Sequence, residues 1–289
     1  MREIEEFHYR LPGRVRGHRP GSHPGLVIGA GQEFVSHVRL YDRPDPRRLD
    51  LRASLRSLTG DWLVRVSRQR SGMAVHALVD VSASMTFGVT PKLHVAADFL
   101  ESLGVSAFRT GDALGLLAFD SVERTELFMP ARLGRGMGSV MATNLRTFKP
   151  AMDGAAPGCG ARGLQAVAQR IAGRQGLVFI VSDFLWPLEQ LGACLDLLTR
   201  AFVVPLVIWN SAEIEPPAAD GIAWLRDAES GARRAVWLRP RLRSRWREAM
   251  AQRRQQLDRV FASRFIRPVY VRDEFSAEAL SRYFLEGAA

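Results

Sequence analysis

Short apolar runs recur through the second part of the chain, and segments with helical periodicity separate them. Such runs, with few polar interruptions, are typical of strands buried on both faces of a sheet. The runs cover residues 75–81, 113–119, 177–182 and 202–209. Between them, leucines and alanines recur every three or four residues, as in 93–103 and 188–198. Alternating strands and helices predict an α/β domain at 71–289 with a doubly wound, mostly parallel, Rossmann-like sheet.

The first 70 residues have a different pattern. Gly, Pro, His and Arg are frequent there, and the apolar segments are short, such as 25–28 and 61–66. Short strands between turn residues indicate a small β-rich unit. We therefore expect a β-rich N-terminal extension at 1–70 ahead of the α/β domain.

The composition permits a full hydrophobic core but adds a strong positive charge. The chain has 289 residues, of which 47% are hydrophobic, and a formal net charge of +10. Arginines concentrate in 10–19, 39–56 and 239–264, with few aromatic residues between them. Nucleic-acid sites usually interleave the two kinds. A surface for an acidic protein partner is therefore favoured over direct nucleic-acid binding.

The same patterns bear on location and thiol chemistry. The longest apolar run, 201–209, is too short for a membrane span and contains Pro205. The acidic start of the chain does not resemble a signal peptide. These features predict no membrane span and a cytoplasmic location. Cys159 and Cys194 form no C-x-x-C pair, which indicates reduced structural thiols.

Candidate ligands for a metal ion follow two of the predicted strands. The first strand runs into Asp80-x-Ser82-x-Ser84, and a later strand is followed by Asp183. Carboxyl ends of parallel strands share one edge of the sheet, and hard divalent cations prefer oxygen ligands. The four residues therefore predict a Mg²⁺ or Mn²⁺ site. The alternative is that Asp80, Ser82 and Ser84 only cap a helix and bind turn amides.

Motifs of common enzyme classes are missing from the sequence. Ser82 and Ser84 have no Gly-x-Ser-x-Gly context, and the six histidines are scattered. Phe34 stands where a dinucleotide-binding loop that starts at Gly29 would need its third glycine. No Gly-Lys-Ser/Thr phosphate loop is present. We therefore expect no enzymatic activity. Because the phosphate loop is missing, we also expect that this chain does not itself hydrolyse ATP.

A strand that ends in Asp-x-Ser-x-Ser, with a second strand followed by Asp, resembles the von Willebrand factor A (vWA) domain and its metal-ion-dependent adhesion site. Residues 39–56 resemble the signature of the bacterial domain-of-unknown-function 58 (DUF 58) family. Similar landmarks follow at 111–119, 181–184 and 227–231, so the resemblance spans almost the whole chain. It implies a β-rich N-terminal part followed by a vWA-like domain.

The resemblance also implies a function. Such proteins are linked with MoxR-type AAA+ ATPases, so the chain is expected to be a non-enzymatic adapter or cochaperone. It would help to mature, assemble or metallate a client protein complex, as accessory proteins of bacterial methanol oxidation do. By analogy, Ser82 and Ser84 would bind the metal directly, and Asp80 and Asp183 partly through water. An open coordination position would accept a partner's Asp or Glu.

Several positions depart from the family pattern. Pro44 replaces a glycine, Leu51 replaces a tryptophan, and this segment is one residue shorter. The usual threonine ligand is missing from 158–163, and Thr143 lies before a separate predicted helix. Two alternatives therefore stay open: a basic module that binds nucleic acid or another polyanion, and a structural scaffold with a vestigial metal site. Salt would weaken polyanion binding, whereas EDTA would weaken a metal-bridged contact.

Overall fold

The computed structural model describes most of the chain. The described residues are 4–11, 13, 20–29, 31, 33–150, 160–218, 220–226 and 231–287. Within them, none of the helices combines the length and apolar character needed to cross a bilayer.

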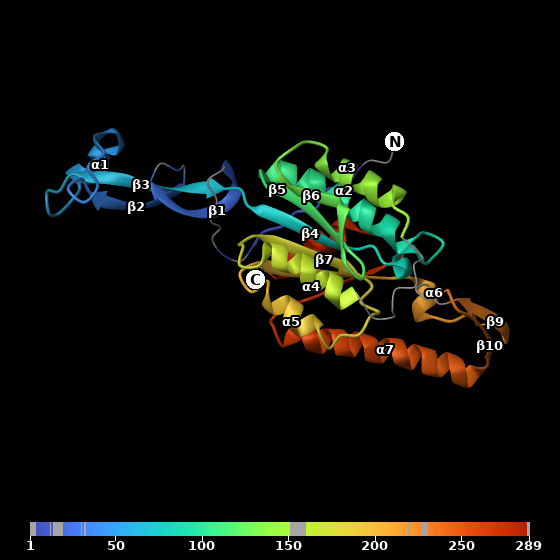
Figure 1. Ribbon diagram of the computed structural model, residues 1–289. Helices are drawn as coiled ribbons and strands as arrows, with labels where there is room; N and C mark the ends of the chain where they lie inside the picture. Colours follow the sequence, from blue (N-terminus) through green and yellow to red (C-terminus); the bar gives the residue numbers. More distant parts are fainter. Residues whose placement is uncertain are drawn as a thin grey trace.

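A six-stranded sheet forms the centre of the molecule (Figure 1). Its strands are β4 (Ala74–Asp80), β5 (Ala113–Phe119), β6 (Glu123–Arg132), β7 (Leu177–Ser182), β8 (Phe202–Trp209) and β11 (Val269–Arg272). The spatial order is β11-β8-β7-β4-β5-β6, and only the edge strand β6 runs antiparallel to its neighbour. The predicted α/β class with a mostly parallel sheet is confirmed. The chain leaves β4 toward β5 and later returns to β7 on the other side of β4, so ligand-binding crevices are expected at the carboxyl ends of β4 and β7.

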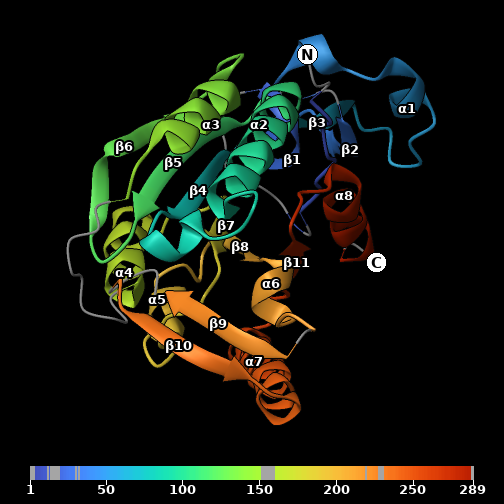
Figure 2. The same ribbon diagram turned by 90° about the vertical axis from the view of Figure 1, so that its right-hand side faces the viewer.

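Helices cover both faces of this sheet (Figure 2). One face packs against α2 (Lys92–Thr110), α3 (Met137–Thr147) and α8 (Ala277–Glu286). The other packs against α4 (Gly160–Ile171), α5 (Leu191–Asp196) and α7 (Pro240–Ala262). Each face has its own cluster of buried apolar side chains, because both faces of the central strands are apolar.

Two helices begin at other residues than their sequences indicate. Thr90-Pro91 is typical of a helix cap followed by the first helical residue, but Pro91 is extended (ψ 136°) and caps a helix that begins at Lys92. The Gly- and Ala-rich segment 154–163 is typical of a loop, but α4 already begins at Gly160. Glycine is needed within this helix because the backbones approach closely: a Cβ at Gly163 would lie 2.2 Å from the carbonyl oxygen of Asp120. The rest of that predicted loop lies outside the described residues.

A three-stranded antiparallel sheet forms an N-terminal arm, which projects from the main body (Figure 1). Its strands β1 (Pro20–Gly29), β3 (Leu63–Ser71) and β2 (Glu33–Arg39) lie in the order β1-β3-β2. The turn η1 (Pro46–Arg48) and the short helix α1 (Leu51–Leu55) lie between β2 and β3. Only Gly72 and Met73 separate β3 from β4, so the arm continues directly into the central sheet.

A second small sheet follows β8. The short helix α6 (Ser211–Ile214) leads to a two-stranded antiparallel hairpin of β9 (Gly221–Arg226) and β10 (Arg233–Leu238). The hairpin then enters α7. It lies beside α6 at the end of the molecule toward which β7 and β8 run (Figures 1 and 2).

Candidate functional site

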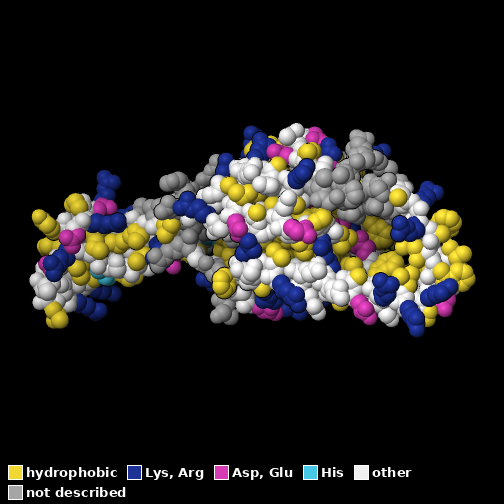
Figure 3. Space-filling model, turned by 60° about the horizontal axis from the view of Figure 1, so that its bottom comes forward, with side chains coloured by type: hydrophobic (Ala, Val, Ile, Leu, Met, Phe, Trp, Pro, Cys, Tyr) yellow, Lys and Arg dark blue, Asp and Glu magenta, His cyan; other side chains and the backbone are white. Residues whose placement is uncertain are grey.

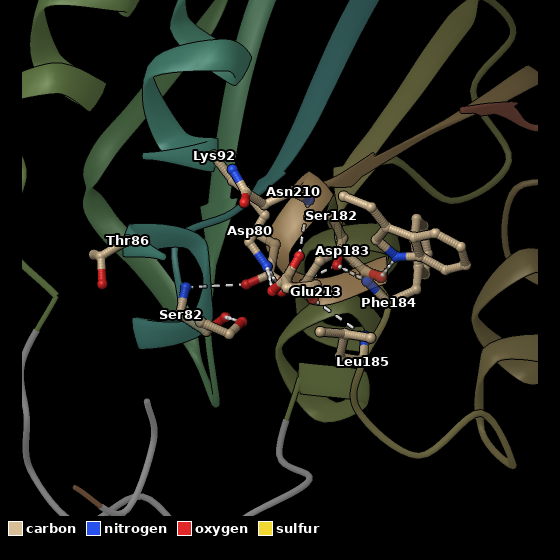
Figure 4. A network of polar contacts seen from close by, with 12 residues as sticks. Asp80, Ser82, Thr86, Lys92, Ser182, Asp183, Phe184, Leu185, Asn210 and Glu213 are labelled. Carbon is tan, nitrogen blue, oxygen red and sulfur yellow. Dashed lines mark hydrogen bonds and ion pairs between the residues drawn. The ribbon is translucent and has the colours of Figure 1, made fainter. Parts of the chain in front are cut away.

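Asp80 ends β4 and is fully buried at the carboxyl edge of the sheet (Figure 4). Its Oδ1 accepts a hydrogen bond from the backbone amide of Ser82 at 3.0 Å. Its Oδ2 accepts from the hydroxyl of Ser182 at 2.6 Å and from the indole Nε1 of Trp186 at 3.2 Å. The carboxylate is therefore held in one orientation by the turn after β4 and by residues at the end of β7.

Ser82 and Ser84 lie in the turn after Asp80, where the short 3₁₀ helix η2 (Ala83–Thr86) begins. Their hydroxyl oxygens face each other at 3.2 Å. Ser82 occupies the N-cap position but makes no side-chain capping bond. Asp80 does bind a turn amide, as the capping alternative expects, whereas the two hydroxyls are directed at each other. This leaves them able to share a third polar group.

Asp183 directly follows β7 and is also completely buried. Its Oδ1 accepts from the amide of Leu185 at 3.1 Å, and its Oδ2 accepts from the ammonium of Lys92 at 2.6 Å. The same ammonium donates to Oε1 of Glu213, in α6, at 2.6 Å. Lys92 is only 1% exposed, so a positive charge lies inside the site between two carboxylates.

Burial and neighbouring charges shift the ionisation of these groups. Burial, followed by repulsion from Asp183, raises the pKa of Asp80 to about 6. Burial alone would lower the pKa of Lys92, but the carboxylates of Asp183 and Glu213 outweigh it and raise that pKa. Lys92 is therefore charged at neutral pH and compensates Asp183, while Asp80 has no basic side chain bonded to it among the described residues.

The loop after β7 is held in place by hydrogen bonds from α7. Phe184 has a left-handed backbone conformation (φ 50°) that side chains seldom adopt. Arg253 of α7 donates to the carbonyl oxygen of Phe184 at 2.7 and 3.0 Å and also to that of Trp186. A Cβ at Gly160 would lie 2.5 Å from the Trp186 ring, so α4 closes tightly over the indole. These contacts fix the partners of Asp80.

Asp80, Ser82 and Ser84 are arranged as expected for a divalent cation that is coordinated mainly by hydroxyl oxygens. Six ligands around Mg²⁺ at 2.0–2.1 Å place adjacent oxygens about 3 Å apart, close to the 3.2 Å between the Ser82 and Ser84 hydroxyls. No group of three or more His, Cys, Asp or Glu side chains in the described part of the chain is arranged to hold a metal. An ion here would therefore depend on the serines, Asp80 and water, with Asp183 engaged by Lys92.

The missing threonine is not replaced by Thr143. This residue lies in α3, and its hydroxyl is exposed and donates to the carbonyl oxygen of Ser139 at 2.8 Å. Cys159, in the segment where the resemblance predicts a threonine ligand, lies outside the described residues.

Sequence reasoning missed four residues that hold the site together: Lys92, Ser182, Trp186 and Glu213. A signal existed for the first. The chain contains 40 Lys and Arg in total, but only Lys92 and Lys149 are lysines. A lysine in a chain that otherwise uses arginine, close after the Asp-x-Ser-x-Ser turn, was a reason to expect that Lys92 has a specific role in the site. Nothing comparable distinguishes Ser182, Trp186 or Glu213 in the sequence.

Comparison with known proteins gives the family. The model of a family described as "Protein of unknown function DUF58" matches residues 37–256. Uncharacterized proteins of Mycobacterium bovis and Mycobacterium tuberculosis are 31% identical, over 83% of this chain and 74% of theirs. Among solved structures, an aerotolerance-related membrane protein from Bacteroides fragilis aligns with a TM-score of 0.39 at 14% identity, covering 74% of this chain and 98% of that one. The hypothetical protein BatB from Bacteroides thetaiotaomicron gives 0.40 at 17%, covering 75% and 99%. The family match and the mycobacterial relatives show that the chain belongs to the DUF58 family.

Proposed function

We propose that this protein is a non-enzymatic adapter with a vWA-like domain that works with a MoxR-type AAA+ ATPase on a client protein complex. In this proposal the protein recognises an acidic group of a partner through Mg²⁺ or Mn²⁺ at the end of β4. The observation that carries it is the pair of facing Ser82 and Ser84 hydroxyls, 3.2 Å apart beside the buried Asp80. Both serines are half-buried, and we take them to be accessible to a ligand in solution.

Each residue has a definite part in such a site. Ser82 and Ser84 would supply adjacent oxygen ligands, and Asp80 would supply the negative charge behind them. A bound cation would offset the repulsion between Asp80 and a partner carboxylate. The ammonium of Lys92 bonds to both Asp183 and Glu213 without any metal, which supports a site that is already assembled in the free protein.

Thermal unfolding tests the metal part of the proposal. A site with a dissociation constant of about 1 mM adds about 1 kcal/mol of stability at about 5 mM Mg²⁺. For a domain of this size, the expected rise in melting temperature over EDTA is about 2–4 °C. The Ser82→Ala/Ser84→Ala variant should lose this rise, because it removes both of the proposed hydroxyl ligands.

Thr86→Ala is the matched control. Thr86 lies in the same turn, but its hydroxyl is exposed, points away from the site (Figure 4) and donates to the carbonyl oxygen of Ala83. This variant should keep the full response to Mg²⁺ or Mn²⁺. An equal response in all three proteins would place the ion elsewhere and contradict the proposed ligands.

Binding to a MoxR-type ATPase from the same genome tests the partner. We expect calorimetric titration to show binding in Mg²⁺ that weakens about tenfold or more in EDTA and in the double serine variant. Thr86→Ala should bind like the wild type. No binding to any MoxR-type ATPase of that genome would refute the adapter role, and binding indifferent to EDTA would refute the metal bridge.

A further inference from the structure

The β9–β10 hairpin exposes an unusual set of side chains. The strand register places Ile222, Trp224 and Trp237 on one face, because Ile222 lies opposite Trp237 and Trp224 lies opposite Ala235. Their exposed fractions are 62%, 74% and 57%. Two tryptophans and an isoleucine exposed together on a short ribbon leave a large apolar area in water, which is common at sites of protein association.

Arginines surround this face. Arg239 places its guanidinium 5.8 Å from the centre of the Trp237 ring, and Arg233 shares the hairpin face by strand alternation. The first turns of α7 add the exposed residues Arg241, Arg245 and Arg247. Within the described residues none of these five has an acidic partner, whereas the neighbouring Arg243 pairs with Asp220. Figure 3 shows hydrophobic and basic side chains together at this end of the molecule.

The base of the hairpin is tied to the Asp80 site. Glu213 binds the ammonium of Lys92 in the site, and its backbone carbonyl accepts from Nε1 of Trp246 in α7 at 2.7 Å. Glu213 also closes the capping box of α6 by accepting from the amide of Asn210 at 2.9 Å. The segment that leads into the hairpin is thus anchored to the same buried charges as the candidate metal site.

We propose that the Ile222, Trp224 and Trp237 face of the hairpin docks an acidic segment of a protein partner that also carries apolar side chains. The arginines determine the sign of the partner's charge, and the apolar face determines that it must bury apolar groups. Tryptophan and arginine are the residues that most often dominate binding energy at protein interfaces. A nucleic-acid strand could stack on the indoles, but it has little to bury against Ile222. The inference rests on the proposed function, because it describes the partner that the strand-end site would engage.

Fluorescence anisotropy with a defined probe tests this surface. The probe is a labelled synthetic peptide of about 15 residues that alternates Glu with Leu and Phe, and its charge-reversed counterpart carries Lys for Glu. Trp224→Ala/Trp237→Ala should weaken binding of the acidic peptide about tenfold or more. Trp62→Ala is the matched control, because Trp62 is an exposed tryptophan (55%) on the distant arm and its loss should change affinity less than about twofold.

The outcomes separate this inference from the proposed function. Full-strength peptide binding by the hairpin variant would overturn the docking surface, as would tighter binding of the lysine peptide or of single-stranded oligothymidine. The Ser82→Ala/Ser84→Ala variant should bind the peptide like the wild type. If that variant lacks a metal response while the hairpin variant alone loses the peptide, both proposals hold. If the wild type lacks the metal response and the hairpin result stands, only the metal proposal fails.

Discussion

At the scale of single residues, the buried charge of Lys92 is the feature that most constrains the site. Its ammonium lies 2.6 Å from both Asp183 and Glu213. We expect Lys92→Met to lower the free energy of unfolding by about 3–5 kcal/mol, because it leaves the buried Asp183 and the partly buried Glu213 without a counter-charge. Urea unfolding at neutral pH measures this loss.

Two comparisons identify the cause of that loss. Lys149→Met removes the other lysine, which is exposed, and should change stability by less than about 0.5 kcal/mol. Adding Asp183→Asn and Glu213→Gln to Lys92→Met should restore part of the lost stability, because the unpaired charges disappear. If the triple variant is no more stable than Lys92→Met, side-chain packing rather than charge is responsible.

The sequence identified part of the site, and the missing part has a physical explanation. Asp80 and Asp183 were found because carboxylates after apolar strands must lie at one edge of a parallel sheet. The outcome for Ser82 and Ser84 as ligands stays a prediction. The role of Lys92 was missed because a lysine at the start of a helix is usually solvated. Its burial depends on Glu213, which comes from a helix 121 residues further along the chain.

At the scale of elements, β4 contains a second buried group with a testable consequence. His76 lies on this strand, and burial, with a further effect from Arg174, lowers its pKa to about 4. That is below its ordinary value of 6.5, so the unfolded chain takes up the proton first on acidification. Stability from His76 is therefore present above about pH 6.5 and is lost as the pH falls toward 4.

The expected size of this effect is about 2 kcal/mol between pH 7 and pH 5. Denaturant unfolding at the two values measures it, with His76→Leu as the reference because leucine cannot titrate. The wild type should lose about 2 kcal/mol more than the variant over this interval. Equal losses in the two proteins would show that the imidazole is protonated as easily in the folded state as in the unfolded chain.

Element prediction succeeded where periodicity is strong. The apolar strands β4, β5, β7 and β8 and the long helices α2 and α7 follow from the sequence pattern. In α7, five apolar residues recur at helical spacing, which predicts one buried face. Of these, Leu257 and Phe261 are fully buried, whereas Leu242, Trp246 and Met250 are half-buried. The exposed face of the β9–β10 hairpin could not be foreseen, because Trp224 and Trp237 resemble ordinary core residues in sequence. Only the register shows that they share an open face.

At the scale of the whole molecule, the arm is joined to the main body through Asp112. This buried carboxylate accepts hydrogen bonds from Tyr9 Oη at 2.5 Å, His23 Nε2 at 2.8 Å, the amide of Met73 at 2.8 Å and Thr110 Oγ1 at 2.9 Å. His23 belongs to β1, so these bonds link an arm strand to the start of the central sheet. The pair Gly111-Asp112, at the start of the 111–119 landmark, thus has a structural role.

Glycines allow the backbones to meet at this joint. A Cβ at Gly72 would lie 2.2 Å from the carbonyl oxygen of Gly111, and a Cβ at Gly21 would lie 2.3 Å from the amide nitrogen of Gly72. Side chains at either position would force the arm away from the body. The polar contacts of Asp112 lie beside this close backbone approach, so we expect them to help hold the arm against the body.

Asp112→Asn should therefore loosen the arm. The amide cannot accept all of these bonds, and we expect a loss of about 2–4 kcal/mol in unfolding free energy together with faster thermolysin cleavage of the arm.

Burial tends to raise the pKa of Asp112, but hydrogen bonds from His23, Tyr9 and Met73 outweigh it and lower that pKa below the ordinary 3.8. The stability from the ionised carboxylate is present above about pH 4 and disappears as the pH falls through the lowered pKa, so wild type and variant should converge in acid. Asp61→Asn, which affects an exposed ion pair with Arg39 within the arm, should change neither the unfolding free energy nor the rate of thermolysin cleavage. An equal effect of the two substitutions would contradict the assignment of Asp112 as the residue that joins the arm to the body.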